Sequence, residues 1–287
     1  MQALYDVPAP AKLNLFLHIT GRRPDGYHLL QSAFMLIDWS DTLHFERRAD
    51  GLLSREDLTT PLPTDDLVLR AARALQQATG VDYGAHIGVA KQIPAQAGMG
   101  GGSSDAASCL LALNRLWELH LPLAQLEEIG LALGADVPFF LRGRNAWVEG
   151  VGERITPLEG ANALPRQRFI VAKPDVGIET HAIFSSELLE RNLDSARIDG
   201  LVADHYGFGR NVLQPVAEAQ CPAVTQAISW LAAKGLNARM TGSGSAVFAA
   251  ASHDVDLQDA PGAWQVRQCD NLEIHPLAGW VFSEDQG

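Results

Sequence analysis

Apolar and polar residues alternate over several short stretches of the chain, with the period of two that indicates β-strands. The first stretch, residues 9–19, carries leucines and an isoleucine on one face and Lys12 and Asn14 on the other. A lysine on a strand usually faces solvent, but this one shares its face with an asparagine. Further strands are predicted over residues 32–39 and 42–47 (separated by a turn at Ser40–Asp41), 87–93, 169–172 and 246–250.

Other stretches repeat apolar residues every three or four positions, which predicts amphipathic helices. The first helix is expected to start at Asp65 or Asp66 and to end at Gly80, because these are common capping residues. Residues 50–63 are expected to be irregular, and Asp136 is expected at a helix exit, just before a buried apolar run. Helices are predicted over residues 67–78, 106–120, 122–134, 181–190 and 222–234.

Glycines and prolines interrupt this pattern between Gly150 and Pro165. We therefore expect one domain over residues 1–157 and a second over residues 158–287. The second part alternates strands and helices again and carries its own glycine loop, residues 241–245.

Residues 94–104, Pro-Ala-Gln-Ala-Gly-Met-Gly-Gly-Gly-Ser-Ser, lie between a predicted strand and a predicted helix. Glycines let a ligand approach the backbone, and a helix start offers unpaired N–H groups to a phosphate. Ser103 and Ser104 are expected to cap the helix. A flexible connector or a capped tight turn is the alternative, since neither Gly-x-x-x-x-Gly-Lys-Ser/Thr nor Gly-x-Gly-x-x-Gly is present.

The composition narrows the function classes. At 287 residues the chain suits one large or two ordinary domains, and 47% apolar with 20% charged residues is typical of a folded protein. A net charge of −12 argues against binding to nucleic acid or to an anionic membrane surface. An anionic ligand in a locally positive pocket is not excluded.

The three cysteines, Cys109, Cys221 and Cys269, are widely spaced, which favours reduced thiols over a disulfide framework or a zinc site. Cys109 is expected in the core. No signal peptide is recognisable, and no apolar segment approaches the roughly 20 residues that span a bilayer. We expect a cytoplasmic protein.

Three features point to phosphoryl transfer: the glycine loop, an upstream lysine at Lys12 and a downstream carboxylate at Asp136. That chemistry needs a backbone cradle for phosphates, a carboxylate to accept the acceptor's proton, and a fixed cation. Each residue alone also has a structural interpretation. Asp136, for example, could merely cap a turn before Pro138.

Taken together, motifs in order along nearly the whole chain resemble those of the GHMP kinases. Within that superfamily the sequence is most similar to the branch that phosphorylates 4-diphosphocytidyl-2-C-methyl-D-erythritol. The resemblance rests on residues 10–15 (Pro-Ala-Lys-Leu-Asn-Leu), 23–28 (Arg-Pro-Asp-Gly-Tyr-His), 98–107 (Gly-Met-Gly-Gly-Gly-Ser-Ser-Asp-Ala-Ala), 133–138 (Leu-Gly-Ala-Asp-Val-Pro), 149–153 (Glu-Gly-Val-Gly-Glu) and 241–245 (Thr-Gly-Ser-Gly-Ser).

The resemblance implies an α+β fold of two domains with the active site between them. The N-terminal one would be like the second domain of ribosomal protein S5, and the C-terminal one ferredoxin-like. The implied reaction moves the γ-phosphate of ATP to the substrate's 2-hydroxyl, with Mg²⁺, in the non-mevalonate pathway to isoprenoid precursors. The partners would be small molecules, with no nucleic acid and no membrane, and the chain a monomer or weak homodimer.

The resemblance also assigns residue roles. Asp136 would be the catalytic base and Lys12 its charged partner, while Asn14 would hold the acceptor's hydroxyls. Substrate would also contact Asp136 and Thr180; Tyr27 and Phe184 would sandwich the cytosine, and His28 would bind its edge. ATP would be held by Lys91, Pro94, Ala95, Gln96, Ala97, Gly98, Met99, Gly100, Gly101, Gly102, Ser103 and Ser104.

The sequence departs from the family's pattern at a few positions. Met99 stands where leucine is usual, a volume-conserving change. Asp66 replaces an asparagine expected to help hold the adenine. Gly101 and Gly102 stand where other members have serines, one of them a magnesium ligand, so the metal ligands are unknown, with Ser103 or Ser104 as the candidates.

Two rival functions stay open. One is a GHMP kinase with a small acceptor such as homoserine or mevalonate, which would not need the Tyr27–His28 pair. The other is a non-catalytic nucleotide-binding module, which would have no use for Lys12 and Asp136.

Overall fold

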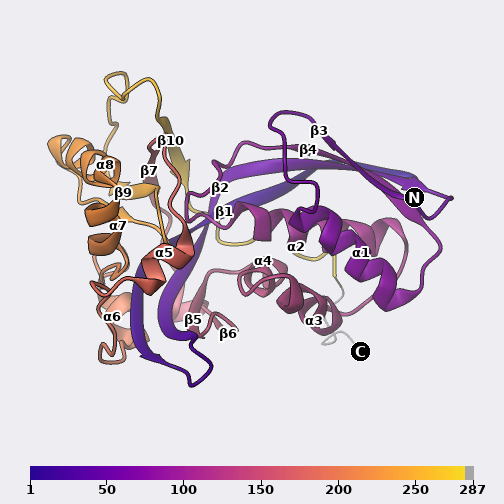
Figure 1. The fold of residues 1–287 in the computed structure, drawn as a ribbon, viewed down its shortest axis with the longest axis horizontal. Helices are drawn as coiled ribbons and strands as arrows, with labels where there is room; N and C mark the ends of the chain where they lie inside the picture. The colour runs from indigo at the N-terminus through magenta and orange to yellow at the C-terminus, as the bar shows by residue number, and fades with distance from the viewer. Residues whose placement is uncertain (282–287) are drawn as a thin grey trace.

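Two long antiparallel strands, β1 (Ala3–Arg22) and β2 (His28–Arg48), connect the two halves of the molecule (Figure 1). In the first half they belong to a sheet. Towards their hairpin end they lie against the second half, where the backbone of Val212 donates to the Leu17 carbonyl at 2.9 Å. The computed structural model describes residues 1–281 of the chain.

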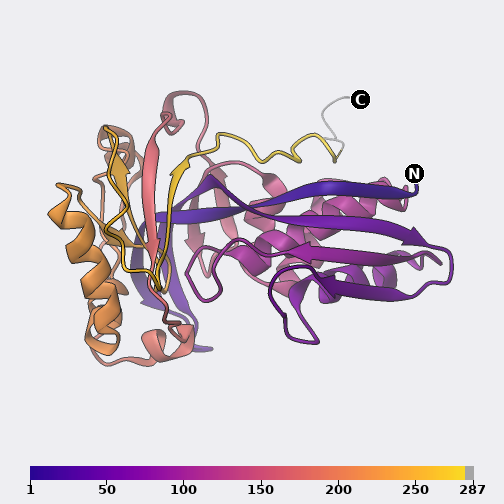
Figure 2. The same cartoon turned by 90° about the horizontal axis from the view of Figure 1, so that it is seen from above.

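Helices cover one face of the first sheet (Figures 1 and 2). β2 is central and pairs antiparallel with β1, β4 and β5, whereas β3 and β4 are parallel. The other elements of this half are β3 (Leu53–Asp57), α1 (Leu67–Thr79), β4 (Gly84–Ala90), α2 (Gly101–Leu116), α3 (Leu123–Leu133), α4 (Val137–Arg142), β5 (Ala146–Gly150) and β6 (Arg154–Pro157).

The predicted turn at Ser40–Asp41 is wrong, because β2 runs through both residues without interruption. Asp41 is fully buried, and its Oδ1 accepts hydrogen bonds from the backbone N–H groups of Gln92 and Ile93. Asp41, which reads locally as a turn residue, is thus a buried acceptor that holds the segment following β4.

The caps of α1 agree with the prediction. Asp66 accepts from the backbone of Leu69 at 3.1 Å, and Gly80 ends the helix with a φ of +66°. The caps of α2 do not. Its N-cap is Gly100, with a φ of +71°, and neither Ser103 nor Ser104 fills that position.

Helix α2 is buried on nearly all sides rather than along one stripe. Its polar residues are satisfied by neighbouring backbone: Ser104 donates to the Pro10 carbonyl at 2.7 Å and Ser108 to the Pro8 carbonyl at 2.9 Å. These bonds attach the helix that follows the glycine loop directly to β1. Cys109 is buried in the core between the first sheet and its helices, as predicted.

The second half is an antiparallel sheet in the order β10-β7-β9-β8, with α8 packed against it (Figure 2). The mixed α+β content agrees with the prediction. The elements are η1 (Gly160–Asn162), β7 (Arg168–Lys173), α5 (Thr180–Ser185), α6 (Ile198–Ala203), α7 (Gln214–Gln220), α8 (Pro222–Ala233), β8 (Arg239–Met240), β9 (Val247–Ala251) and β10 (Gln265–Asp270).

After β10 the chain returns to the first half. The backbone of His275 donates to the Gly143 carbonyl at 2.8 Å, and Leu277 is buried in the core beneath the first sheet. A further core lies where the two sheets meet, with Trp147 from β5 and Phe248 from β9. The domain limit at residue 157 stays a prediction.

Element ends were the least accurate predictions. Strand β3 falls within residues 50–63, which were expected to be irregular, and β4 ends before Lys91. Helix α2 ends at Leu116 instead of 120, and α5 at Ser185 instead of 190. The apolar run after Asp136 is buried as predicted, but it forms helix α4.

Candidate active site

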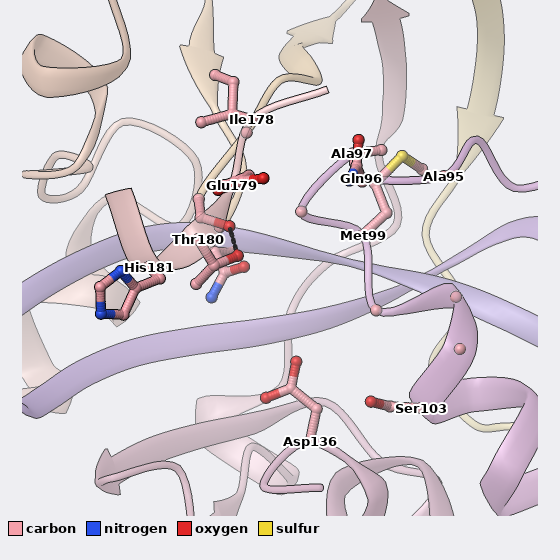
Figure 3. A pocket seen from close by; sticks show the side chains of 18 of the residues that line it. Ala95, Gln96, Ala97, Met99, Ser103, Asp136, Ile178, Glu179, Thr180 and His181 are labelled. Atoms are coloured by element: carbon pink, nitrogen blue, oxygen red, sulfur yellow. Dashed lines mark hydrogen bonds between the residues drawn. The ribbon is translucent and has the colours of Figure 1, made fainter. Parts of the chain in front are cut away.

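A cleft of about 1620 Å³ lies between the two halves. Its walls come from the glycine loop and α2, from the start of α4, from the hairpin end of β1 and β2, and from α5 with the second glycine loop. Figure 3 shows Asp136 and Ser103 on one side of this cleft and Thr180 and His181 on the opposite side.

Lys12 and Asp136 meet at the cleft. Lys12 Nζ lies 3.6 Å from Asp136 Oδ2, and the Asp136 side chain is 30% exposed while that of Lys12 is 5% exposed. Lys12 comes from β1 and Asp136 from the turn between α3 and α4, so the fold joins residues more than a hundred positions apart. The lysine, predicted on a strand face, is thus buried and not solvated.

The surroundings of Lys12 restrict both its position and its charge. Nζ donates to Asn14 Oδ1 at 2.5 Å and lies 4.6 Å from the centre of the Phe34 ring. Asn14 Nδ2 in turn donates to Ser32 Oγ at 2.9 Å. Burial lowers the pKa of Lys12 from its usual value, and the Asp136 carboxylate opposes that shift.

The glycine loop needs glycine at two positions for reasons of backbone conformation. Gly98 and Gly100 have φ values of +72° and +71°, which L side chains rarely adopt. A Cβ on Gly98 would lie 2.2 Å from the Thr241 carbonyl oxygen, and one on Gly100 would lie 3.0 Å from the Phe140 ring. The loop thus packs against the second glycine loop on one side and α4 on the other.

The two serines of the loop have different surroundings. Ser104 is fully buried and bonded to β1, and it does not line the cleft. Ser103 lines the cleft, and a Cβ placed on Gly134 would lie 3.8 Å from its Oγ. Since Gly134 precedes Asp136 by two positions, the Ser103 hydroxyl borders the turn that carries Asp136 (Figure 3).

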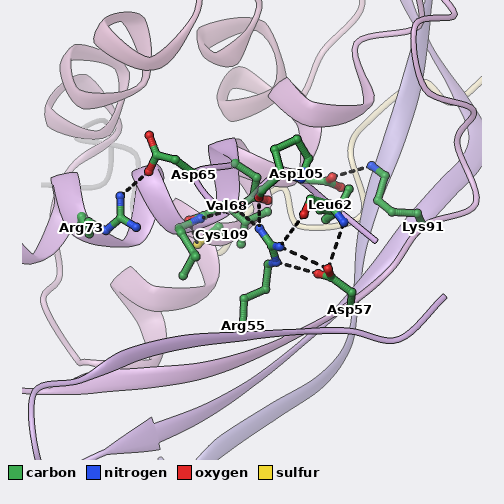
Figure 4. Close-up of polar contacts among 12 residues, drawn as sticks. Arg55, Asp57, Leu62, Asp65, Val68, Arg73, Lys91, Asp105 and Cys109 are labelled. Atoms are coloured by element: carbon green, nitrogen blue, oxygen red, sulfur yellow. Dashed lines mark hydrogen bonds and ion pairs between the residues drawn. The ribbon is translucent and has the colours of Figure 1, made fainter. Parts of the chain in front are cut away.

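Lys91 does not present a free ammonium to the cleft. Nζ donates to Asp105 Oδ2 at 2.5 Å (Figure 4). It also donates to Asp41 Oδ2. Burial raises the pKa of Asp105 above its usual range, against the opposing charge of Lys91. This buried network links β2, the end of β4 and α2 beneath the glycine loop.

Asp66 also has partners already. Besides capping α1, its Oδ1 pairs with Arg55 Nη1 at 2.7 Å, and Arg55 also binds Asp57 and the carbonyls of Leu62 and Pro63. Figure 4 shows Arg55 beside Asp57 and Leu62. The side chain that replaces the expected asparagine therefore has a structural role here.

The residues predicted to bind the base gather at the other end of the cleft. Tyr27 is 65% exposed, and the ring centroids of His28 and Phe184 are 5.3 Å apart. Burial lowers the pKa of His28, and the positive charges of Arg191 and Arg22 lower it further. Thr180 exchanges a 2.8 Å hydrogen bond with Ser243 Oγ (Figure 3).

Several residues of the site were missed by sequence reasoning. Asp41, Asp105 and Arg191 contact predicted site residues only through the tertiary fold, and nothing in the local pattern around Asp41 or Arg191 indicates this. Asp105 lies within the quoted glycine motif, so its position next to the loop's serines was the available signal.

Within residues 1–281 no three His, Cys, Asp or Glu side chains form a cluster that could hold a metal ion. In the same part of the chain, no helix has the length and apolar character required to cross a bilayer.

Comparison with known proteins identifies the family. Residues 66–144 match the family model for the GHMP kinases N terminal domain, and residues 187–269 match that for the GHMP kinases C terminal. The 4-diphosphocytidyl-2-C-methyl-D-erythritol kinase of Paracidovorax citrulli is 68% identical over 285 residues, covering 99% of this chain and 100% of the relative. The Delftia acidovorans protein of the same name is 66% identical over 285 residues, covering 99% of each chain.

Solved structures agree. The crystal structure of a 4-(cytidine 5'-diphospho)-2C-methyl-D-erythritol kinase superposes with a TM-score of 0.77 at 31% identity, covering 93% of this chain and 98% of the other. A homoserine kinase from Cytophaga hutchinsonii shares the fold, with a TM-score of 0.70 at 15% identity and 96% coverage of both chains. On its two matched family models and on relatives similar over almost its whole length, this chain belongs to the GHMP kinases.

Proposed function

We propose that this chain transfers the γ-phosphate of ATP to the 2-hydroxyl of 4-diphosphocytidyl-2-C-methyl-D-erythritol, in the non-mevalonate pathway to isoprenoid precursors. Use of ATP follows from the family, and the acceptor from the names of relatives that are 68% and 66% identical. The observation that carries the chemistry is the 3.6 Å contact between Lys12 Nζ and Asp136 Oδ2 beside the glycine loop.

In this proposal Asp136 takes the proton of the acceptor hydroxyl as its oxygen attacks the γ-phosphorus. Its partial exposure leaves one side of the carboxylate open to the cleft. Lys12 offsets the charge that develops on the transferred group, a role that needs a fixed cation in a site sheltered from water. Asn14 holds Lys12 through Oδ1 and has a second amide proton to offer the acceptor.

ATP would lie along residues 94–103, with its phosphates at the start of α2. The positive φ values of Gly98 and Gly100 turn the backbone there, and the first turn of α2 offers N–H groups that lack helical partners. Lys91 would act through its backbone or by supporting Asp105, because its ammonium is already paired with two carboxylates.

The cytidyl end of the acceptor would lie between Tyr27 and Phe184, with His28 at the base edge. The cleft extends from the glycine loop to these three residues, so one ligand could contact both ends. Homoserine and mevalonate are too small to use this part of the cleft, which favours the cytidyl acceptor.

Mg²⁺ would be held chiefly by the phosphates of ATP. This ion favours oxygen ligands, keeps several waters, and commonly uses one or two carboxylates plus phosphates. The Ser103 hydroxyl, which lines the cleft beside the turn that carries Asp136, is the protein oxygen that would add to its coordination shell. Bound there, it would neutralise phosphate charge during transfer.

The test is ADP release by the purified chain, with ATP, Mg²⁺ and each of three acceptors: the cytidyl conjugate, homoserine and mevalonate. The proposal predicts turnover with the cytidyl conjugate alone. Faster turnover with homoserine or mevalonate would favour a GHMP kinase with a small acceptor. Tight ATP binding without turnover on any acceptor would favour a non-catalytic nucleotide-binding module.

A further inference from the structure

Arg191 connects the two sides of the cleft at the end where we place the base. Its Nε donates to His28 Nε2 at 3.0 Å. Its terminal nitrogens donate to backbone carbonyls: Nη1 to Leu189 at 3.2 Å, and Nη2 to Phe184 at 3.0 Å and Ser186 at 3.1 Å. One side chain therefore holds both the histidine on β2 and the segment that carries Phe184.

The contact with Arg191 fixes which nitrogen of His28 carries the proton. A guanidinium has only N–H donors and stays protonated in proteins, so His28 Nε2 must accept with its lone pair. In a neutral imidazole the proton then lies on Nδ1. The neutral form is favoured because burial and the charges of Arg191 and Arg22 lower the pKa of His28.

His28 Nδ1 is therefore a donor, and it is available to a ligand. His28 lines the cleft, and within residues 1–281 the hydrogen bond of its imidazole ring is the one that Nε2 accepts from Arg191. Stacking on Tyr27 and Phe184 would add affinity for any base, because every base has a π-face. Selection among bases has to come from hydrogen bonds at the base edge.

We propose that Arg191 is a positioning residue for substrate choice: it holds His28 as the tautomer that donates from Nδ1, so that the site accepts cytosine and rejects uracil. Cytosine N3 is an acceptor, whereas uracil N3 carries a proton. A fixed donor therefore pairs with cytosine and meets another donor in uracil, which leaves both groups unsatisfied. This inference rests on the proposed function, because it assumes a cytidyl substrate.

The experiment compares kcat/KM for the cytidyl conjugate and its uridyl analogue in the wild type, Arg191→Met and Arg191→Lys. Without the arginine, His28 can turn its lone pair to Nδ1 and accept from uracil. Arg191→Met is expected to lower the cytidyl-to-uridyl ratio about tenfold or more, mainly through KM. Arg191→Lys should keep most of the ratio, because an ammonium also only donates.

Arg197→Met is the matched control, since Arg197 is an exposed arginine that pairs with Asp199 at 3.0 Å. Its loss should change kcat/KM for neither substrate. Equal losses of kcat/KM for both substrates in Arg191→Met would make Arg191 only a support for the α5 segment and overturn the inference. Wild-type kcat/KM for both substrates in Arg191→Met would overturn it as well, and so would a lysine variant that behaves like the methionine variant.

Calorimetric binding of CDP and UDP separates this inference from the proposed function. A wild type that binds CDP more tightly than UDP, with the preference lost in Arg191→Met, supports the role of Arg191 even if the cytidyl conjugate is not phosphorylated. Turnover of the conjugate with no change of nucleotide preference in the variant supports the proposed function and contradicts the inference.

Discussion

The backbone of Gly98 touches the backbone of Thr241, so closely that a Cβ on Gly98 would lie 2.2 Å from the Thr241 carbonyl oxygen. Two glycine loops from different halves are thus in direct contact. Next to this contact the Ala246 backbone donates to the Ala97 carbonyl at 3.3 Å. The loop we assign to ATP is therefore held from both halves of the chain.

This contact predicts how much a single added methyl group lowers the free energy of unfolding. Gly98→Ala should reduce the free energy of unfolding more than Gly80→Ala, although both glycines have a positive φ, +72° and +66°. Around Gly80 nothing lies within 4 Å of the added Cβ, so that variant measures backbone strain alone, about 1–2 kcal/mol. At Gly98 the clash with Thr241 should add about 1–3 kcal/mol. Urea unfolding of both variants measures the two free energies of unfolding. Equal decreases in the two variants would mean that the loop moves away from Thr241 freely.

Asp136→Asn tests the base. The amide keeps the shape but cannot take a proton, so kcat should fall by about 10²–10⁴-fold while ATP affinity stays near the wild-type value. Asp199→Asn, at an exposed surface pair, is the control and should leave kcat unchanged. Nearly full kcat in Asp136→Asn would remove Asp136 from the mechanism.

The charge on Lys12 predicts a pH dependence. Burial lowers the pKa of Lys12 below 10.5, so kcat should decline on the alkaline side at a pH below that value. Arg stays protonated throughout this range. A pH profile of Lys12→Arg should therefore lack this alkaline decline, even if the variant is slower overall. The same decline in wild type and variant would assign it to another group.

Asp105 predicts a pH effect on stability. The pKa of Asp105 is raised in the folded chain, whereas in the unfolded chain it lies near 3.8. As the pH rises, the unfolded chain therefore loses this proton before the folded chain does. The proton's contribution to the free energy of unfolding is fully present below pH 3.8 and is lost as the pH rises through the raised pKa of the folded chain. The stability of wild type relative to Asp105→Asn should therefore fall from acid to neutral pH. Asp50→Asn is the control with the opposite sign, because the pKa of Asp50 is lowered to about 2.

Tyr27 tests stacking separately from base selection. Its side chain is 65% exposed, so Tyr27→Ala should leave stability unchanged. It should weaken the cytidyl and uridyl conjugates alike, chiefly in KM, by an amount that corresponds to about 1–3 kcal/mol. Steady-state kinetics on both conjugates checks this, and an unchanged KM would place the base elsewhere in the cleft.

The family, the two-domain α+β fold and the kinase activity follow from motifs, and the comparisons confirm them. Lys12 and Asp136 were predicted as partners, and the fold brings them to 3.6 Å. Their roles, like those of the other site residues, stay proposals.

What the sequence could not provide are contacts made across the fold. Asp41 reads locally as a turn residue, yet it is buried in a continuous strand because it pairs with Lys91 and with backbone N–H groups after β4. Ser103 and Ser104 read as caps of a helix expected from residue 106, but α2 starts five residues earlier at Gly101, with Gly100 as its cap. Arg191 gave no local signal, because its partners lie on β2 and α5.

The most direct test of the proposed function is phosphorus NMR of the product formed from ATP, Mg²⁺ and 4-diphosphocytidyl-2-C-methyl-D-erythritol by the wild-type chain. One new phosphomonoester is expected, on the 2-hydroxyl, with one ADP formed for each product molecule. A phosphate on another hydroxyl, or ADP formed without any phosphorylated acceptor, would contradict it.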